Sequence, residues 1–200
     1  MPLPDLPNYA FLLDYYRNYA NPKAKISREV KNGNLIRLKR DLYLNRNSFD
    51  RGIPLELVAN RLYGPSYVSF ERALRYYGLI PEEVPGITSA GFNKRRSKCF
   101  ITSIGTFFYQ DIPQSVYSQG VVLISAGSWR YLSATAEKAL CDKLYKIPGI
   151  RSKKELIALL FDDLRIDEEE FNNLDKAELC RLAVLYKSTT LDCLRMYLGA

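Results

Sequence analysis

The chain has 200 residues, of which 47% are hydrophobic, a composition typical of a folded globular protein. No stretch has the roughly 18 consecutive apolar residues of a membrane helix, and residues 1–7 lack the features of a secretory signal. We therefore expect a cytoplasmic protein with no membrane partner. The absence of histidine excludes histidine-based triads and most zinc sites, and we expect the widely spaced cysteines to be buried in a reducing compartment: Cys99, Cys141, Cys180 and Cys193.

The net charge of +7 is unevenly distributed along the chain. It is +4 in residues 1–50, +5 in residues 51–150 and −2 in residues 151–200. A basic front half indicates a polyanionic partner, although an inert, solvated basic surface explains the charge equally well.

Two helices are predicted at the N-terminus. The first begins near Asn8 and ends before Asn21, because apolar residues recur there at helical spacing. The second is delimited by Asn21, a good N-cap, followed by Pro22, and by Gly33, which suits a left-handed C-terminal cap. Its apolar residues Ile26 and Val30 share one face, and its basic residues gather on the opposite one.

A short hairpin is predicted over residues 35–44. Ile36 and Leu38 alternate with Arg37 and Lys39, which is typical of a half-exposed strand, and residues 42–44 can return as a second strand. A helix followed by a basic hairpin is the order of a recognition helix and its wing in a winged helix-turn-helix.

The remaining chain predicts a mixed α/β body and a helical end. We interpret residues 45–52 as a linker, 53–62 as a helix, and the next segment as a helix capped by Ser69 that ends near Gly78. Predicted strands cover residues 87–90, 99–103, 106–111, 121–125 and 129–132, and predicted helices cover 135–147, 153–164, 168–174, 176–186 and 190–198. The fold class is therefore α+β, with a winged helix-turn-helix in residues 1–48, a mixed α/β domain in 49–150 and a helical extension in 151–200.

The strongest candidate for function is the basic cluster of residues 22–48, which holds 8 Lys and Arg against 2 Asp and Glu. A helix fits the DNA major groove, and a basic hairpin can contact the flanking phosphates. The alternative is a solvated amphipathic helix beside an exposed hairpin. The candidate DNA-binding residues are Lys23, Lys25, Ser27, Arg28, Lys31, Arg37, Lys39 and Arg40, of which Ser27, Arg28 and Lys31 are the candidates for reading bases.

A second basic run lies in a predicted loop and either contacts phosphates or is only a charged hairpin tip: Lys94, Arg95, Arg96 and Lys98. Aromatic runs lie in apolar segments, so we expect them in the core rather than stacked on single-stranded nucleic acid: Tyr15-Tyr16, Tyr76-Tyr77 and Phe107-Phe108-Tyr109. We expect no catalytic residue, no metal and no cofactor, since Lys138 and Asp142 are more simply a surface ion pair and no nucleotide-binding or nucleophile motif occurs.

Three segments resemble the AbiEi-type antitoxins of type IV abortive-infection toxin–antitoxin systems. Residues 34–43 resemble the family's wing, "hydrophobic-Arg-x-x-Arg-Gly-hydrophobic-Tyr", with Asp41 in the place of glycine. Residues 65–80 are similar to "Pro-Ser-Tyr-hydrophobic-Ser…Ala-Leu…Tyr-His-Gly-Leu-Ile", with Tyr77 in the place of histidine. Residues 134–142 resemble the "Glu-Lys-Ala-Leu-x-Asp" helix.

The resemblance implies a winged-helix regulator that represses its own operon by binding double-stranded operator DNA, which we expect to contain inverted repeats. It also implies an antitoxin that opposes a nucleotidyltransferase-like toxin without needing a stable complex with it. The middle motifs are expected to be structural. Two other hypotheses stay open at this point: a protein-interaction module whose degenerate winged helix does not bind DNA, and a nucleic-acid-processing enzyme.

Overall fold

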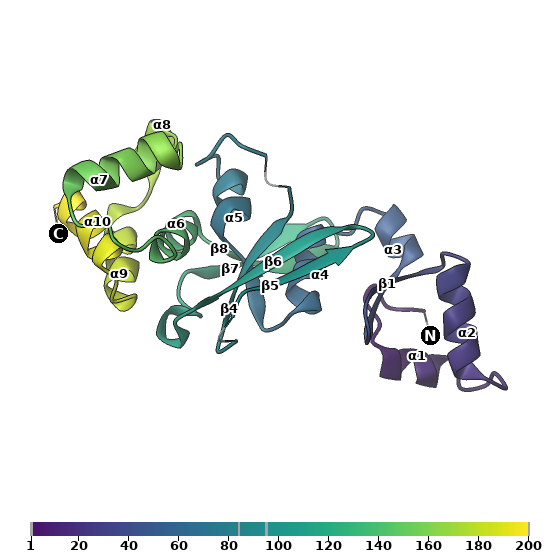
Figure 1. The fold of residues 1–200 in the computed structure, drawn as a ribbon. Helices are drawn as coiled ribbons and strands as arrows, with labels where there is room; N and C mark the ends of the chain where they lie inside the picture. The colour runs from purple at the N-terminus through teal and green to yellow at the C-terminus, as the bar shows by residue number, and fades with distance from the viewer. Residues whose placement is uncertain (1, 84, 95, 200) are drawn as a thin grey trace.

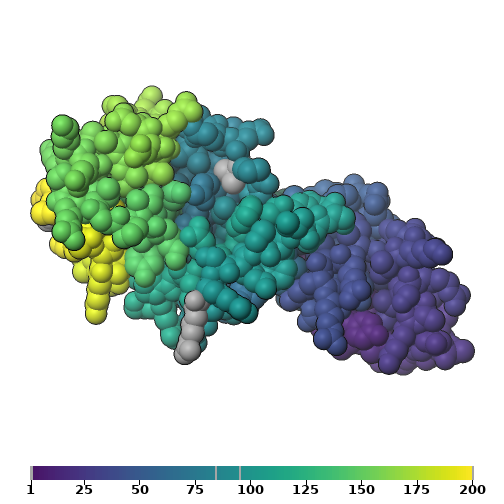
Figure 2. All heavy atoms as spheres, viewed as in Figure 1, coloured from purple at the N-terminus to yellow at the C-terminus, as the bar shows by residue number. Residues whose placement is uncertain are grey.

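The structure, a computed structural model, describes residues 2–83, 85–94 and 96–199 of an α+β protein. The N-terminal residues form a lobe at one end, a mixed sheet lies in the middle, and the C-terminal helices lie at the other end (Figure 1). In the space-filling view the N-terminal lobe projects from the rest of the molecule (Figure 2). No helix in the described part of the chain is long and apolar enough to cross a membrane.

The N-terminal lobe contains α1 (Tyr9–Tyr15), α2 (Pro22–Lys31), β1 (Leu35–Lys39) and β2 (Leu42–Asn45). The predicted cap of α2 is confirmed, because the Asn21 side chain accepts a hydrogen bond from the Ala24 amide at 3.0 Å. Gly33 follows the helix with φ +79°, a conformation that glycine adopts without strain. The predicted hairpin is also confirmed, since β1 and β2 pair antiparallel.

Both faces of this hairpin are covered. On one face, Leu35 and Tyr43 pack with residues of α1 and α2 in a small core. On the other face, Leu38 and Leu44 belong to the core shared with the central sheet. The outer edge of β2 is occupied by the N-terminal segment, because the Tyr43 amide donates to the Pro7 carbonyl at 3.0 Å. The hairpin is therefore more enclosed than its alternating sequence predicts.

The segment interpreted as a linker contains a helix, α3 (Arg46–Asp50), so that prediction is wrong. The Asn45 side chain accepts from the Asn47 amide at 3.1 Å and initiates the helix, while Ser48 is fully buried. The expected domain boundary at residue 48 falls inside α3.

Asp5 joins the lobe to the body of the protein. Its carboxylate accepts hydrogen bonds from Ser48 Oγ at 2.6 Å and from Trp129 Nε1 at 2.9 Å, and it forms an ion pair with Arg51 at 3.2 Å. The Arg51 guanidinium also lies over the Trp129 ring. One carboxylate thus connects the N-terminal segment, α3 and the central sheet.

The central sheet has the strand order β5-β6-β4-β3-β8-β7. Its strands are β3 (Ser66–Val68), β4 (Ile87–Phe92), β5 (Lys98–Thr102), β6 (Gly105–Ile112), β7 (Val121–Ala126) and β8 (Trp129–Ala134). The pairs β4–β6 and β3–β8 are parallel and the others antiparallel, which makes the sheet mixed. The predicted strands are confirmed, and β3 is an additional strand that the sequence analysis missed.

Helices cover the two faces of the sheet. One face packs Val68 and Tyr131 with α4 (Leu55–Leu62), and the other packs Tyr67 and Ala134 with α5 (Phe70–Tyr76) and α6 (Ala136–Tyr145). A 3₁₀ turn (Gln114–Val116) precedes β7. The C-terminal segment consists of α7 (Lys153–Ile157), a π-helical segment (Ala158–Asp163), α8 (Glu168–Asn173), α9 (Lys176–Leu185) and α10 (Thr189–Leu198). Its apolar residues share one core with α5 and α6.

A buried polar network links the body to these C-terminal helices. Lys138 and Asp142 are both fully buried and lie 3.1 Å apart, so the prediction of a surface ion pair is wrong. Lys138 Nζ also donates to the Val116 carbonyl at 2.9 Å and lies 2.5 Å from the Tyr186 hydroxyl, which lies 2.5 Å from Asp142. Desolvation lowers the pKa of Lys138, while Asp142 acts in the opposite direction.

Asp142 also receives hydrogen bonds from Tyr67 at 2.9 Å and from Ser69 at 2.6 Å. Ser69 precedes α5, but its side chain makes no capping hydrogen bond, so its predicted role is wrong. The reason is local: Phe70, the first helical residue, has φ +56°, and the Ser69 hydroxyl is engaged by Asp142. The two motifs in residues 65–80 and 134–142 therefore meet in one network.

The cysteines and aromatic doublets depart in part from expectation. Cys141 and Cys193 are buried, Cys180 is half-buried and Cys99, on the edge strand β5, is exposed; all four are free thiols. Tyr15 and Tyr76 are likewise exposed, whereas their respective neighbours Tyr16 and Tyr77 pack into the cores. Each doublet therefore contributes one ring to the interior.

Candidate nucleic-acid interface

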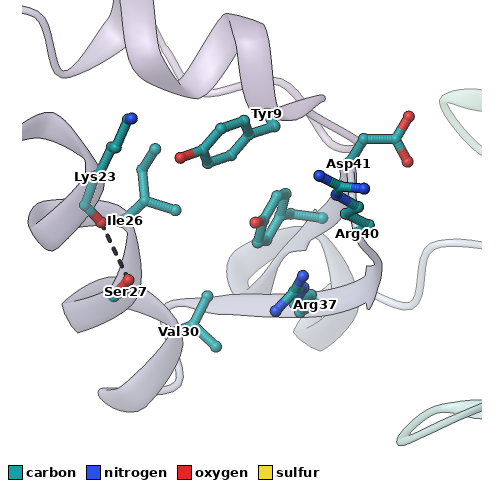
Figure 3. Close-up of a pocket in the computed structure, with 9 residues that line it drawn as sticks. Tyr9, Lys23, Ile26, Ser27, Val30, Arg37, Arg40 and Asp41 are labelled. Atoms are coloured by element: carbon teal, nitrogen blue, oxygen red, sulfur yellow. Dashed lines mark hydrogen bonds between the residues drawn. The ribbon is translucent and has the colours of Figure 1, made fainter.

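An open cleft of about 920 Å³ lies between α2, the start of α1 and the β1–β2 hairpin. In Figure 3, Lys23, Ile26, Ser27 and Val30 line it from the helix, Tyr9 from above, and Arg37, Arg40 and Asp41 from the hairpin. Ile26 and Val30 are the apolar part of this helical wall, in keeping with the shared face predicted from their spacing. The cleft is thus concave, with basic side chains on both walls.

Three cations are available in this cleft. Lys23, Arg37 and Arg40 are all exposed, and none of them forms an ion pair with a carboxylate of the described residues. Asp41 is the acidic residue of the lining, so the balance of charge is positive. Separated, unpaired cations on a concave surface bind phosphates or other anions favourably.

Ser27 lies on the helical wall of the cleft. Its hydroxyl donates to the Lys23 carbonyl within the helix at 3.1 Å, drawn as a dashed line in Figure 3. With its proton engaged, the hydroxyl oxygen is oriented to accept a hydrogen bond from a ligand.

Two predicted residues outside the cleft lining, Lys25 and Lys39, are each paired with a carboxylate. Lys25 is half-buried, lies 2.5 Å from Glu29 and packs over the Tyr19 ring. The hydrogen bond between these two side chains raises the pKa of Lys25 and lowers that of Glu29. Lys39 lies 3.6 Å from Asp41. Both cations are therefore partly neutralised by a neighbouring carboxylate.

Arg28 and Lys31 are exposed on α2 but do not line the cleft. Spacing of about 100° per residue places them on the outer face of the helix, beyond Ser27. The predicted DNA-binding residues therefore divide into a cleft group, an outer helical group and the two paired lysines.

Two tyrosines that the sequence analysis assigned to no site also line the cleft. Tyr9 and Tyr43 stack with ring centroids 6.4 Å apart. Burial raises the pKa of Tyr43, so this phenol keeps its proton and can donate a hydrogen bond. The sequence contained one relevant pattern, because Tyr43 pairs with Arg37 across the hairpin and hence lies on the same face of it.

The turn of the hairpin accommodates Asp41 without glycine. Asp41 does not have a positive φ, and the ladder instead shifts register between Arg37 and Lys39. The Asp41 carbonyl accepts a hydrogen bond from the Tyr9 amide at 3.0 Å, which connects the turn to the start of α1.

Of the second basic run, Lys94 and Arg96 lie in the loop between β4 and β5, as predicted, whereas Lys98 is the first residue of β5. Lys94 donates to the Gly64 carbonyl at 3.1 Å and lies over the Tyr63 ring, whereas Arg96 and Lys98 are exposed. Arg95 lies outside the described residues. This loop belongs to the central sheet and does not contribute to the cleft.

Within residues 2–83, 85–94 and 96–199, no group of three or more Cys, Asp or Glu side chains is arranged to hold a metal ion. Within the same ranges, Lys138 and Asp142 form a buried ion pair, and neither side chain has any exposed surface.

No protein-family model matches the chain, and no curated protein is significantly similar to it.

Proposed function

We propose that this protein binds double-stranded DNA and represses its own gene, and that it acts as the antitoxin of a type IV toxin–antitoxin pair. The observation that carries the DNA-binding proposal is the cleft in which Lys23, Arg37 and Arg40 remain unpaired on two facing walls. Phosphate contacts from such side chains supply most of the affinity of a DNA-binding protein.

The order of elements supports a winged-helix mode. An extended N-terminal segment bonded to β2 is followed by α1, α2 and the β1–β2 hairpin. This is the order of a winged helix that lacks its first helix. In such a mode the outer face of α2, with Arg28 and Lys31, faces the major groove, and the cleft receives the adjacent phosphate backbone.

A binding titration with DNA from upstream of the protein's own gene tests this proposal. Each phosphate contact contributes about 0.9 to the slope of log affinity against log salt. The double variant Arg37→Ala/Arg40→Ala should therefore flatten the slope by about two units. Lys154→Ala, which removes an exposed charge from α7 at the far end of the molecule, is the matched control and should bind like the wild type.

A second candidate is a protein-interaction module that no longer binds DNA. It is favoured by the pairing of Lys25 with Glu29 and of Lys39 with Asp41, which reduces the free positive charge of the lobe. This candidate predicts weak binding to DNA and no difference between the double variant and the Lys154→Ala control.

The antitoxin part of the proposal rests on the resemblance of three segments to AbiEi-type proteins. Two of these segments meet in the buried network of Lys138 and Asp142, which is in keeping with a structural role for the motifs. A nucleotidyltransferase-like reading frame beside the gene should arrest growth when expressed alone, and coexpression of this protein should restore growth. Unrelieved arrest would contradict the antitoxin role while leaving DNA binding intact.

A further inference from the structure

The two edges of the central sheet differ in the charge that they carry. Strands β5 and β7 are the edge strands, and no strand among the described residues pairs with the outer side of either. An open edge exposes unpaired backbone N–H and C=O groups, and natural proteins usually protect such an edge with charge, proline, a bulge or a covering element.

Strand β7 has none of the protections that its own sequence could provide. It reads Val-Val-Leu-Ile-Ser-Ala, without a charge, a proline or a glycine, and its register with β8 is continuous, without a bulge. Strand β5, in contrast, begins at the exposed Lys98 and follows the basic loop that contains Lys94 and Arg96. The charge on β5 disfavours a second copy of the chain there, whereas β7 itself carries no charge that would repel one.

The hairpin geometry determines which backbone groups of β7 face outward. A two-residue turn, with Gly127 at φ +61°, places Ala126 opposite Trp129. In such a hairpin the residues that flank the turn form a hydrogen-bonded pair, and the pattern alternates along the ladder. Val121, Leu123 and Ser125 consequently direct their N–H and C=O groups to the open edge.

The side chains at this edge are apolar and exposed. Leu123 lies opposite Leu132 of β8 on the same face of the sheet, and these side chains are 55% and 41% exposed. If a second β7 is placed antiparallel about an axis at Leu123, the two Leu123 side chains meet and form one row with both Leu132 side chains.

We propose that two copies of this chain pair through β7, antiparallel about a two-fold axis at Leu123, and form one continuous sheet. Such an interface is isologous, because the same strand serves both copies. It satisfies the outward backbone groups of Val121, Leu123 and Ser125, and it brings no like charges together. The proposal does not depend on DNA binding.

Sedimentation equilibrium of the full-length protein tests the interface. We expect the wild type to have the mass of two chains in the micromolar range and Leu123→Lys to have the mass of one chain. Ile101→Lys, at a side chain that is 84% exposed on the opposite edge strand, is the matched control and should remain a dimer. Circular dichroism identifies any variant that is misfolded. A monomeric wild type, or dissociation by Ile101→Lys alone, would overturn the proposal.

Disulfide trapping tests the register independently and does not rely on a disruptive change. In a Cys99→Ser background, Leu123→Cys should form a cross-linked dimer under mild oxidation, because opposed residues of a hydrogen-bonded pair have Cα atoms about 5.5 Å apart, within disulfide range. Ser125→Cys should not, because the two copies of residue 125 are then four residues apart along the strands, about 13 Å. Equal cross-linking of both variants, or of neither, would contradict the proposed pairing.

Discussion

The basic side chains of the N-terminal lobe are not equivalent, although the sequence places them within a few residues of one another. Arg37 and Arg40 are exposed and unpaired in the described part of the chain, while Lys25 is held by Glu29 one helical turn away. A salt-dependent contribution to DNA binding is therefore expected from the first two and much less from Lys25.

Base reading is the role we expect for the outer face of α2. Arg28→Ala or Lys31→Ala should weaken binding to the operator by about 1–3 kcal/mol if the side chain contacts a base, and much less on random DNA. Arg37→Ala should weaken binding to both DNAs alike, because phosphate contacts carry no sequence information. Competition titrations with operator and scrambled duplexes measure the difference, and equal losses on both duplexes for all three variants would exclude a base-reading role for α2.

Loss of one partner of the buried ion pair should lower the free energy of unfolding far more than loss of one partner of an exposed pair. Lys138→Met leaves the Asp142 carboxylate buried without its cation and should lower the free energy of unfolding by about 3–5 kcal/mol. The double variant Lys138→Met/Asp142→Leu should cost less than the sum of the single variants, since no isolated charge remains. Urea denaturation provides the values for this cycle.

Lys143→Met is the control on the same helix for that cycle. Lys143 pairs with Glu71 at 2.5 Å, and both side chains are partly exposed. Its loss should cost no more than about 1 kcal/mol. Comparable losses for Lys138→Met and Lys143→Met would show that burial does not set the strength of the first pair.

At the scale of elements, local patterns predicted the structure where a cap or a periodicity was present. Asn21, Pro22 and Gly33 delimit α2, and alternation identified β1. Strand β3 was missed because it has only three residues, all buried, and α3 was missed because it is a five-residue helix in a polar segment. Neither length gives a readable period.

Contacts between distant residues were not predictable from local patterns. Ser69 and Lys138 were assigned local roles, a cap and a surface pair, whereas both belong to the network around Asp142. Of the candidate site, the basic residues were predicted and the tyrosine lining was not, because the packing of α1 against the hairpin brings Tyr9 to Tyr43 across 34 positions of the chain.

The C-terminal helices share the core of the body, so their removal should disrupt the body. A chain ending at residue 150 loses Leu179, Leu182 and Leu194 from the largest apolar cluster and Tyr186 from the buried network. We expect the truncated protein to lose cooperative thermal unfolding, monitored by circular dichroism. If it remains folded, its DNA affinity should be nearly unchanged, since the proposed cleft lies at the opposite end of the molecule (Figure 1).

At the scale of the whole molecule, the pH dependence of folding stability should be governed by tyrosines. Burial raises the pKa of Tyr117 and of Tyr131 to about 12, and it also raises the pKa of Tyr67, Tyr109 and Tyr186. A tyrosine has a pKa of about 10 in an unfolded chain. The stabilisation from these groups is therefore complete below about pH 10 and is lost as the pH rises toward their folded values.

Stability should accordingly be flat between about pH 6 and 8, because the chain has no histidine to titrate there, and should fall above about pH 10. The lowered pKa of Lys138 acts in the opposite direction but concerns a single group. Urea midpoints across this range, together with the ultraviolet absorbance of tyrosinate, measure both effects. A fall in stability between about pH 6 and 8 would contradict the conclusion that tyrosines govern its pH dependence.

The carboxylate of Asp5 has a consequence for the geometry of an operator. Because Asp5 bonds to Ser48 and Trp129 at once, the lobe that carries the cleft is held directly against the sheet. In a pair of copies joined through β7, the two clefts then stand at one fixed angle, and a duplex can enter both only if its half-sites are in helical phase. Five extra base pairs, about half of the 10.5 in a turn, would rotate one half-site to the far side of the duplex. Asp5→Ala removes the polar part of this attachment and leaves the apolar packing of Leu38 and Leu44 in place, so it should make binding slightly more tolerant of such insertions.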